Sequence, residues 1–208
     1  MALTKVRGKG LGTLGDGTAN DTAIVFDGNA QDFHIGLDDS TDSLTIGLGS
    51  ALGTTSHMVI DANGHITKPL QSAFLVQPST AQLNFPINAS TTIAYGTEIF
   101  DQNGDFSSNT FTAPVTGRYQ LNINLYLQSL DLDVNYYQPE LHTSNRTYFF
   151  IIGTDGFDAD VNYFSLNFCS LVDMDANDTA HVVFRTRNLG AAQVDLGTES
   201  WFSGYLVC

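Results

Sequence analysis

Strict alternation of apolar and polar residues over one long segment constrains this chain most. In the segment GRYQLNINLYLQS, residues 117–129, the apolar positions are Leu121, Ile123, Leu125 and Leu127, and Asn, Tyr or Gln stands after each of them. A period of two buries one face of a β-strand and leaves the other face toward water. The segment therefore predicts a long strand in an antiparallel sheet.

Further strand-like runs follow, and Asp-, Asn- and Gly-rich loops separate them without any amphipathic helical window. Of the 208 residues, 42% are hydrophobic, 14% are charged and 19 are glycine, a composition that favours a β protein with a real core. Many antiparallel strands of this length predict a sandwich or jelly roll. The runs are TYFFIIG, NYFSLNFCSLV, AHVVFRTRN and SWFSGYLVC.

The first third of the chain has a different character. Glycine recurs every few residues in 8–17, so this segment is expected to be extended. Between Thr22 and Thr67, short apolar runs alternate with turns such as Asp27-Gly28 and Asn63-Gly64, which have hairpin chemistry. One copy of such short strands buries too little apolar surface to offset its ordering entropy. Several chains are therefore expected to pack these strands together, as a trimer.

Lys68-Pro69 marks the expected boundary between the two parts, because proline removes a ladder donor and restricts the residue before it. We predict an extended N-terminal anchor at 1–20, a β-rich stem at 21–69 and a jelly-roll head at 70–208. The predicted fold class is all-β: a C-terminal antiparallel jelly-roll sandwich preceded by a thin stem of β-strands and turns, trimeric.

The charge of the chain limits its partners. Lys and Arg total 8 against 22 Asp and Glu, and Lys5, Arg7 and Lys9 precede the first acid, Asp16. The acidic remainder repels phosphate backbones and anionic membranes, so no nucleic acid is expected as a partner. The early basic cluster is a candidate docking arm, with an ordinary solvated terminus as the alternative. Neither a signal-peptide pattern nor an apolar run of about 18 residues is present, so we expect no membrane insertion.

Residues 99–127 resemble the core of the globular head of complement component 1q and its tumour necrosis factor relatives. In that family a turn-rich stretch precedes the pattern F-x-A/C-P-x-x-G-x-Y and an alternating strand. The matching residues of this chain are Phe111, Ala113, Pro114, Gly117 and Tyr119.

Two later segments extend this resemblance. Residues 165–184 resemble the family's penultimate strand pair, and 201–207 resemble its terminal aromatic-S-G-aromatic strand. The resemblance covers roughly 71–208 and implies a jelly roll that assembles as a compact trimer, with Tyr119 and Tyr205 in the trimer core. The ligand does not carry over, because heads of this family recognise unrelated molecules through their loops.

The opening MALTKV, the glycine-rich segment and the stretch from FDGN to VIDANGHIT resemble the start of phage fibre and appendage proteins. This resemblance implies a structural protein of the virion, such as a tail fibre. It would be anchored to other virion proteins by Lys5, Arg7 and Lys9 and would bind a host cell-surface receptor or glycan with its head. A head fibre or capsid decoration protein is one alternative, and a bacterial lectin-like binding module is another.

The candidate host-binding loops are 131–137, 139–146 and 155–160, which mix aromatic and charged groups with turn residues, although plain solvated connections are the alternative for each residue. The candidate residues in these loops are Asp133, Tyr136, Tyr137, His142, Arg146 and Asp158.

Two triplets have the first spacing of a calcium loop, but neither completes the twelve-residue pattern, so ordinary polar turns are favoured. The triplets are Asp101, Asn103, Asp105 and Asp173, Asp175, Asn177. The five histidines lack zinc spacing. No nucleophile elbow, P-loop or C-x-x-C motif occurs, so we expect no catalytic residue, no metal and no cofactor.

The two cysteines, Cys169 and Cys208, fall in apolar strand-like runs. This position favours buried free thiols over a disulfide.

Overall fold

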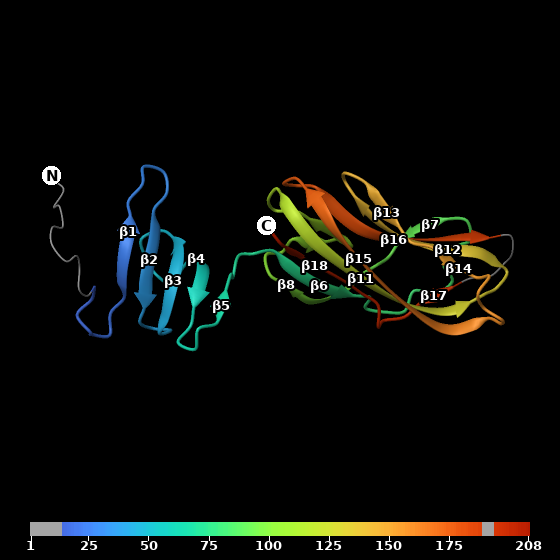
Figure 1. Ribbon diagram of the computed structural model, residues 1–208, viewed down its shortest axis with the longest axis horizontal. Coiled ribbons are helices and arrows are strands. Elements are labelled where there is room, and N and C mark those ends of the chain that lie inside the picture. The colour runs from blue at the N-terminus through green and yellow to red at the C-terminus, as the bar shows by residue number, and fades with distance from the viewer. Residues whose placement is uncertain (1–13, 189–193) are drawn as a thin grey trace. The chain divides into compact units, whose positions relative to one another are not determined.

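The computed structural model describes residues 14–188 and 194–208, and the elements in these ranges are all β-strands (Figure 1). Within these ranges no helix is long and apolar enough to cross a membrane. The chain divides into two compact units, Met1–Leu70 and Gln71–Cys208. We call them the stem unit and the head unit and describe each by itself.

The stem unit is one five-stranded antiparallel sheet in which each strand pairs with its neighbour in the sequence. Figure 1 shows the strands side by side in chain order. The Asn63-Gly64 turn joins the last two strands, and Gly64 has a φ of 86°, which glycine adopts without strain. The strands are β1 (Thr22–Phe26), β2 (Phe33–Asp38), β3 (Ser43–Leu48), β4 (Ser56–Ile60) and β5 (Ile66–Thr67).

This sheet buries its polar face. On β2 the side chains of Phe33, Ile35 and Leu37 are exposed, whereas His34 and Asp38 are buried. The loop after β3 covers the polar face: a Cβ atom at Gly36 would lie 2.7 Å from Leu52 Cδ2, and one at Gly53 would lie 2.9 Å from Asp38 Oδ2. In the described part of the stem unit, the side chains classed as buried are all polar: His34, Asp38, Ser43 and Thr45.

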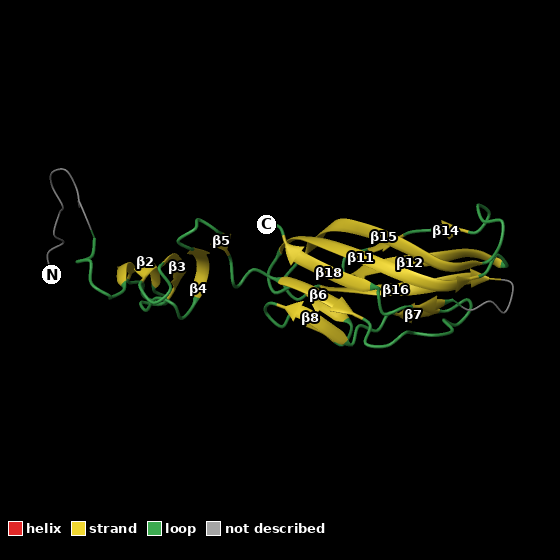
Figure 2. Ribbon diagram, turned by 90° about the horizontal axis from the view of Figure 1, so that it is seen from below, coloured by secondary structure: helices red, strands yellow, loops and turns green. Residues whose placement is uncertain are grey.

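The head unit contains two antiparallel sheets. One has the order β13 (Thr147–Phe149), β12 (Val134–Thr143), β16 (Thr179–Asn188), β10 (Thr110–Thr112) and β9 (Phe106–Ser107), with β14 (Ile152–Gly153) beside β12 and β7 (Ser90–Thr92) beside β16. The other has the order β15 (Val161–Met174), β11 (Gly117–Leu130), β18 (Trp201–Leu206), β6 (Ala73–Gln77) and β8 (Thr97–Asp101), with β17 (Asp195–Leu196) beside β11. Figure 2 shows the strands of the second sheet side by side.

The predicted long strand is β11, and its alternation is confirmed. Leu121, Ile123, Leu125 and Leu127 are 0% exposed. β11 pairs with β15 along nearly its whole length and with β18 on its other side. The alternation therefore marks an interior strand of a sheet with one face in the core.

Aromatic rings fill the core beside the F-x-A-P-x-x-G-x-Y segment. The ring centroid of Phe74 lies 4.8 Å from that of Phe111 and 5.0 Å from that of Phe202. Tyr119 is 0% exposed, and its hydroxyl donates a hydrogen bond of 2.7 Å to the carbonyl oxygen of Val115. Tyr119 therefore belongs to the core of a single chain, which corrects the prediction that it lies at a trimer axis.

The cysteines are free, but the prediction that both are buried was wrong, because both are exposed. Cys169 pairs in register with Asn122 of β11, and the neighbouring Ile123 and Phe168 face the core. The pleat therefore turns Cys169 toward the outer face of the sheet.

Candidate binding surfaces of the head unit

The candidate host-binding residues lie at two opposite ends of the head unit and along one strand between them. Asp133 precedes the first residue of β12, and Arg146 lies in the turn after its last residue. A ten-residue strand spans roughly 30 Å, so the predicted loops do not form a single tip.

At the end that carries Asp133, two connections are joined by hydrogen bonds. The backbone N–H of Leu132 donates to Asp160 Oδ1 at 3.1 Å, and that of Asp131 donates to the hydroxyl oxygen of Tyr137 at 2.8 Å. Asp133 and Asp158 are exposed, as a binding loop requires. Several carboxylates thus crowd this end of the head, which makes it unsuited to anionic ligands.

At the other end, Arg146 forms an exposed ion pair with Asp173, with Nη2 and Oδ2 2.9 Å apart. Asp178 Oδ2 accepts hydrogen bonds from the backbone N–H of Asp175 and from Asn145 Nδ2. Asp173 of the second triplet with calcium-loop spacing is thus held in an ion pair, and the neighbouring Asp178 in turn hydrogen bonds.

The first triplet is arranged in a similar way. Asp101 accepts hydrogen bonds from the backbone N–H groups of Asp105 and Phe106, at 3.0 and 2.8 Å. Within residues 14–188 and 194–208, no group of three or more His, Cys, Asp or Glu side chains is placed to hold a metal ion.

Tyr136, Tyr137 and His142 were predicted in loops, and this placement was wrong, because all three lie in β12. Tyr137 is 0% exposed and belongs to the core, and burial raises the pKa of its hydroxyl. Tyr136 and His142 are half-buried. Only the latter two retain surface that a ligand can reach.

A polar cluster surrounds Glu140 on the outer face of β12 and β16. Since Tyr137 and Leu141 face the core, the pleat places Glu140 and His142 on the opposite face. The register sets His142 beside His181, and their ring centroids are 5.2 Å apart. We call Gln138, Glu140, His142, His181 and Arg185 the Glu140 cluster.

The carboxylate of Glu140 is the centre of this cluster, although only 3% of the residue is exposed. His142 Nε2 lies 2.5 Å from Oε2, Gln138 Nε2 donates to Oε1 at 2.5 Å, and Arg185 Nε lies 3.7 Å from Oε1. These contacts satisfy the hydrogen-bonding atoms of a carboxyl group that is shielded from water. Burial, and secondarily the neighbouring His142, lowers the pKa of His181.

The cluster surrounds a buried carboxyl group with polar side chains, without a nucleophile activated by a base. His142 and Arg185 keep 31% and 28% of their side chains exposed, so His142 Nδ1 and the terminal N–H groups of Arg185 can meet a polar ligand. Of these five residues, only His142 was predicted from the sequence as a candidate binding residue. The polar residues Gln138, Glu140 and His142 alternate along the sequence, and this pattern could have indicated that they share one face of a strand. The contribution of His181 and Arg185 follows only from the pairing of β12 with β16.

Comparisons with known proteins agree with this architecture. No family model matches the chain, and no curated protein matches it. Among solved structures, the globular domain of the zebrafish complement 1qA protein is similar with a TM-score of 0.50 and 15% identity, over 66% of this chain and 98% of that chain. Murine APRIL has a TM-score of 0.48 and 11% identity, over 66% and 99% of the two chains.

At such low identity, the likeness to the 1q domain shows the fold alone. The predicted all-β class and the antiparallel jelly-roll head are confirmed, together with the resemblance of the head to the 1q globular domain. The fold is compatible with a binding head domain.

Proposed function

We propose that this chain is a structural protein of a phage virion, a tail fibre or similar appendage, that forms a homotrimer and binds the host surface with its head unit. The observation that carries the proposal is the jelly-roll head, which superimposes on 98% of the length of a 1q globular domain and follows a separate β unit. A rigid scaffold with variable loops suits attachment rather than catalysis.

The chemistry of the head surface supports binding. The polar groups of the Glu140 cluster satisfy one another, and His142 and Arg185 keep exposed polar surface. Tyr136, which lies in the same strand outside the cluster, adds half-buried aromatic surface. A host glycan or a polar protein surface fits such groups. Three copies of a weak site in one particle appendage would raise avidity without new contacts.

The phage assignment is supported by the opening segment and by the change of unit after Leu70. Lys5, Arg7 and Lys9, the proposed anchor, lie outside the described residues. Deleting residues 1–13 is expected to leave trimers intact while the protein fails to join particles. Loss of trimers in this deletion would contradict the anchor assignment.

Attachment itself is tested with the full-length protein. We expect purified protein to bind host cells and to compete with particle adsorption. Immunogold labelling of particles should place the protein on the tail. Label on the capsid would support a decoration protein instead, and absence from particles would support a free lectin-like module.

A further inference from the structure

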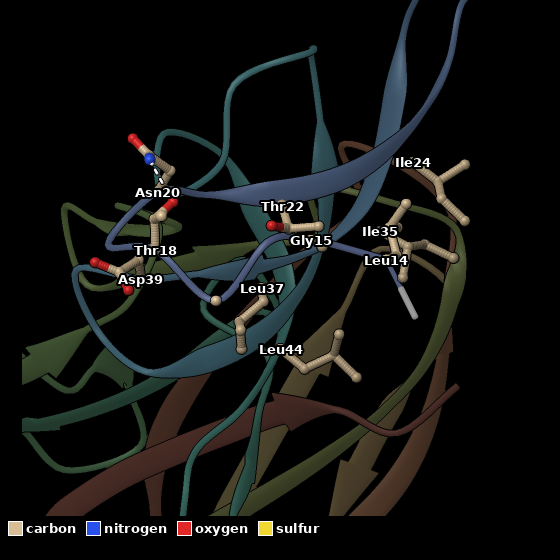
Figure 3. A pocket seen from close by; sticks show the side chains of 12 residues that line it. Leu14, Gly15, Thr18, Asn20, Thr22, Ile24, Ile35, Leu37, Asp39 and Leu44 are labelled. Carbon is tan, nitrogen blue, oxygen red and sulfur yellow. Dashed lines mark hydrogen bonds between the residues drawn. The ribbon is translucent and has the colours of Figure 1, made fainter. Parts of the chain in front are cut away.

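The stem unit exposes a continuous apolar face, and the pairing register brings its side chains into rows. One row contains Ile24, Ile35 and Ile46, and a neighbouring row contains Leu37 and Leu44. These residues and Phe33 are each 37–49% exposed. Figure 3 shows Leu37, Leu44 and Ile35 around a hollow of about 430 Å³ on this face, together with Leu14.

The opposite face of the same sheet is already occupied by the chain itself. A Cβ atom at Gly47 would lie 2.3 Å from the carbonyl oxygen of Thr55 and 2.7 Å from the ring of His34, so the loop after β3 is packed closely there. His34 is 0% exposed, and its Nδ1 lies 3.0 Å from the carbonyl oxygen of Gly49. Among the described residues of the stem unit, the chain therefore covers this face over β2 and β3 and leaves the apolar face open to a partner.

From these observations, and resting on the proposed homotrimer, we infer that the apolar face of β1, β2 and β3 packs against the same face of two further copies of this chain. The six exposed side chains supply roughly 500 Å² per chain, taking about 200 Å² for a fully exposed side chain of this size. A standard interface takes about 800 Å² from each partner, so the residues at the rim, such as Phe26, would supply the remainder.

Charge favours a second copy as the occupant. The chain carries a net charge of −14, so two copies can approach closely only over an uncharged surface. The residues that the register places on this face are uncharged on β1, β2 and β3, whereas the covered face carries Asp38 and His34. Burying the apolar face among copies would give the stem unit the hydrophobic core that one chain does not provide.

The test compares Ile35→Asp with Val25→Asp in the full-length chain. Ile35 is 38% exposed and Val25 is 40% exposed, but Val25 pairs with His34 and therefore lies on the opposite face. We expect a trimeric wild type by sedimentation. In Ile35→Asp, amide hydrogen exchange in β2 and β3 should be at least about tenfold faster, and Val25→Asp should exchange like the wild type.

A cross-linking experiment distinguishes loss of the interface from local unfolding caused by the Asp side chain. In a background with Cys169→Ser and Cys208→Ser, a bismaleimide should join chains through Ile35→Cys but not through Val25→Cys. Cross-links only at Val25→Cys, or unchanged exchange in Ile35→Asp within a trimer, would overturn this inference and leave the proposed function standing. A monomeric wild type would overturn both this inference and the proposed trimer.

Discussion

Replacing Gly204 with alanine tests the packing of the head core. Gly204 pairs with Leu121 on one side and with Phe74 on the other. A Cβ atom at this position would lie 2.5 Å from Leu121 Cδ2 and 2.7 Å from Phe74 Cε1. Leu121 is 0% exposed and Phe74 is 1% exposed, so neither can turn away into solvent. The added methyl group must therefore displace packed side chains.

Two effects of opposite sign set the magnitude. Overpacking a close-packed core costs about 1–3 kcal/mol, whereas alanine in place of glycine in a strand gains about 0.5–1 kcal/mol. Because both neighbours are confined, we expect a net loss of about 1–2 kcal/mol in the free energy of unfolding. For a domain of this size, that lowers the Tm by roughly 2–8 °C.

The assay is thermal unfolding of the full-length protein followed by circular dichroism, with Gly153→Ala as the matched control. Gly153 lies in β14, and a Cβ atom there would meet nothing within 4 Å. With no clash, the control should be as stable as the wild type or more stable by up to about 1 kcal/mol. A Gly204→Ala protein as stable as the wild type would refute the reasoning.

Three further predictions concern the Glu140 cluster and the outer face of β18. Burial makes protonation of His181 less favourable in the folded state than in the unfolded state. Its contribution to the free energy of unfolding is therefore present above the unfolded pKa of about 6.5 and is lost as the pH falls. In urea titrations of His181→Gln, the free energy of unfolding should decline less below that pH than in the wild type. Glu140→Gln should lower the free energy of unfolding by about 1–2 kcal/mol, because it weakens the hydrogen bonds of a buried group. The control Glu98→Gln, at an exposed position, should change it little. Equal effects in the two variants would contradict the role of Glu140. Tyr205 is 48% exposed in one chain. Tyr205→Asp should therefore leave the free energy of unfolding of the single chain nearly unchanged, while sedimentation should show that the trimers dissociate. Trimers that persist in this variant would exclude Tyr205 from the interface.

The sequence predicted the long strand and the core motif because local periodicity and spacing determine them. The alternation from Leu121 to Leu127 specifies which face of β11 is buried, and Phe111 packs where the motif implies. Alternation does not say what covers a face. Burial inside one chain and burial at an axis between chains leave the same pattern, and Tyr119 was misplaced for this reason.

Two other misplacements have local causes. Residues 139–146 mix charged groups with turn residues such as Pro139, which suggested a loop, although Pro139 pairs in register with Phe184 inside β12. In the stem unit, alternation predicted strands, but the loop that covers the polar face of the sheet follows only from the three-dimensional path of residues 49–55. The Glu140 cluster likewise depends on a pairing between strands about 40 residues apart.

The position of β6 in its sheet has a mechanical consequence. β6 is the first strand of the head unit, and it pairs with β18 on one side and with β8 on the other. Any tension transmitted along the chain through Leu70 reaches the head at β6, directly after Ser72, whose carbonyl oxygen accepts a hydrogen bond from Leu206. Pulling this strand out would require two ladders to break together, whereas an edge strand is held by only one. The head is thus joined to the rest of the chain at a strand that resists detachment, as the proposed appendage function would require.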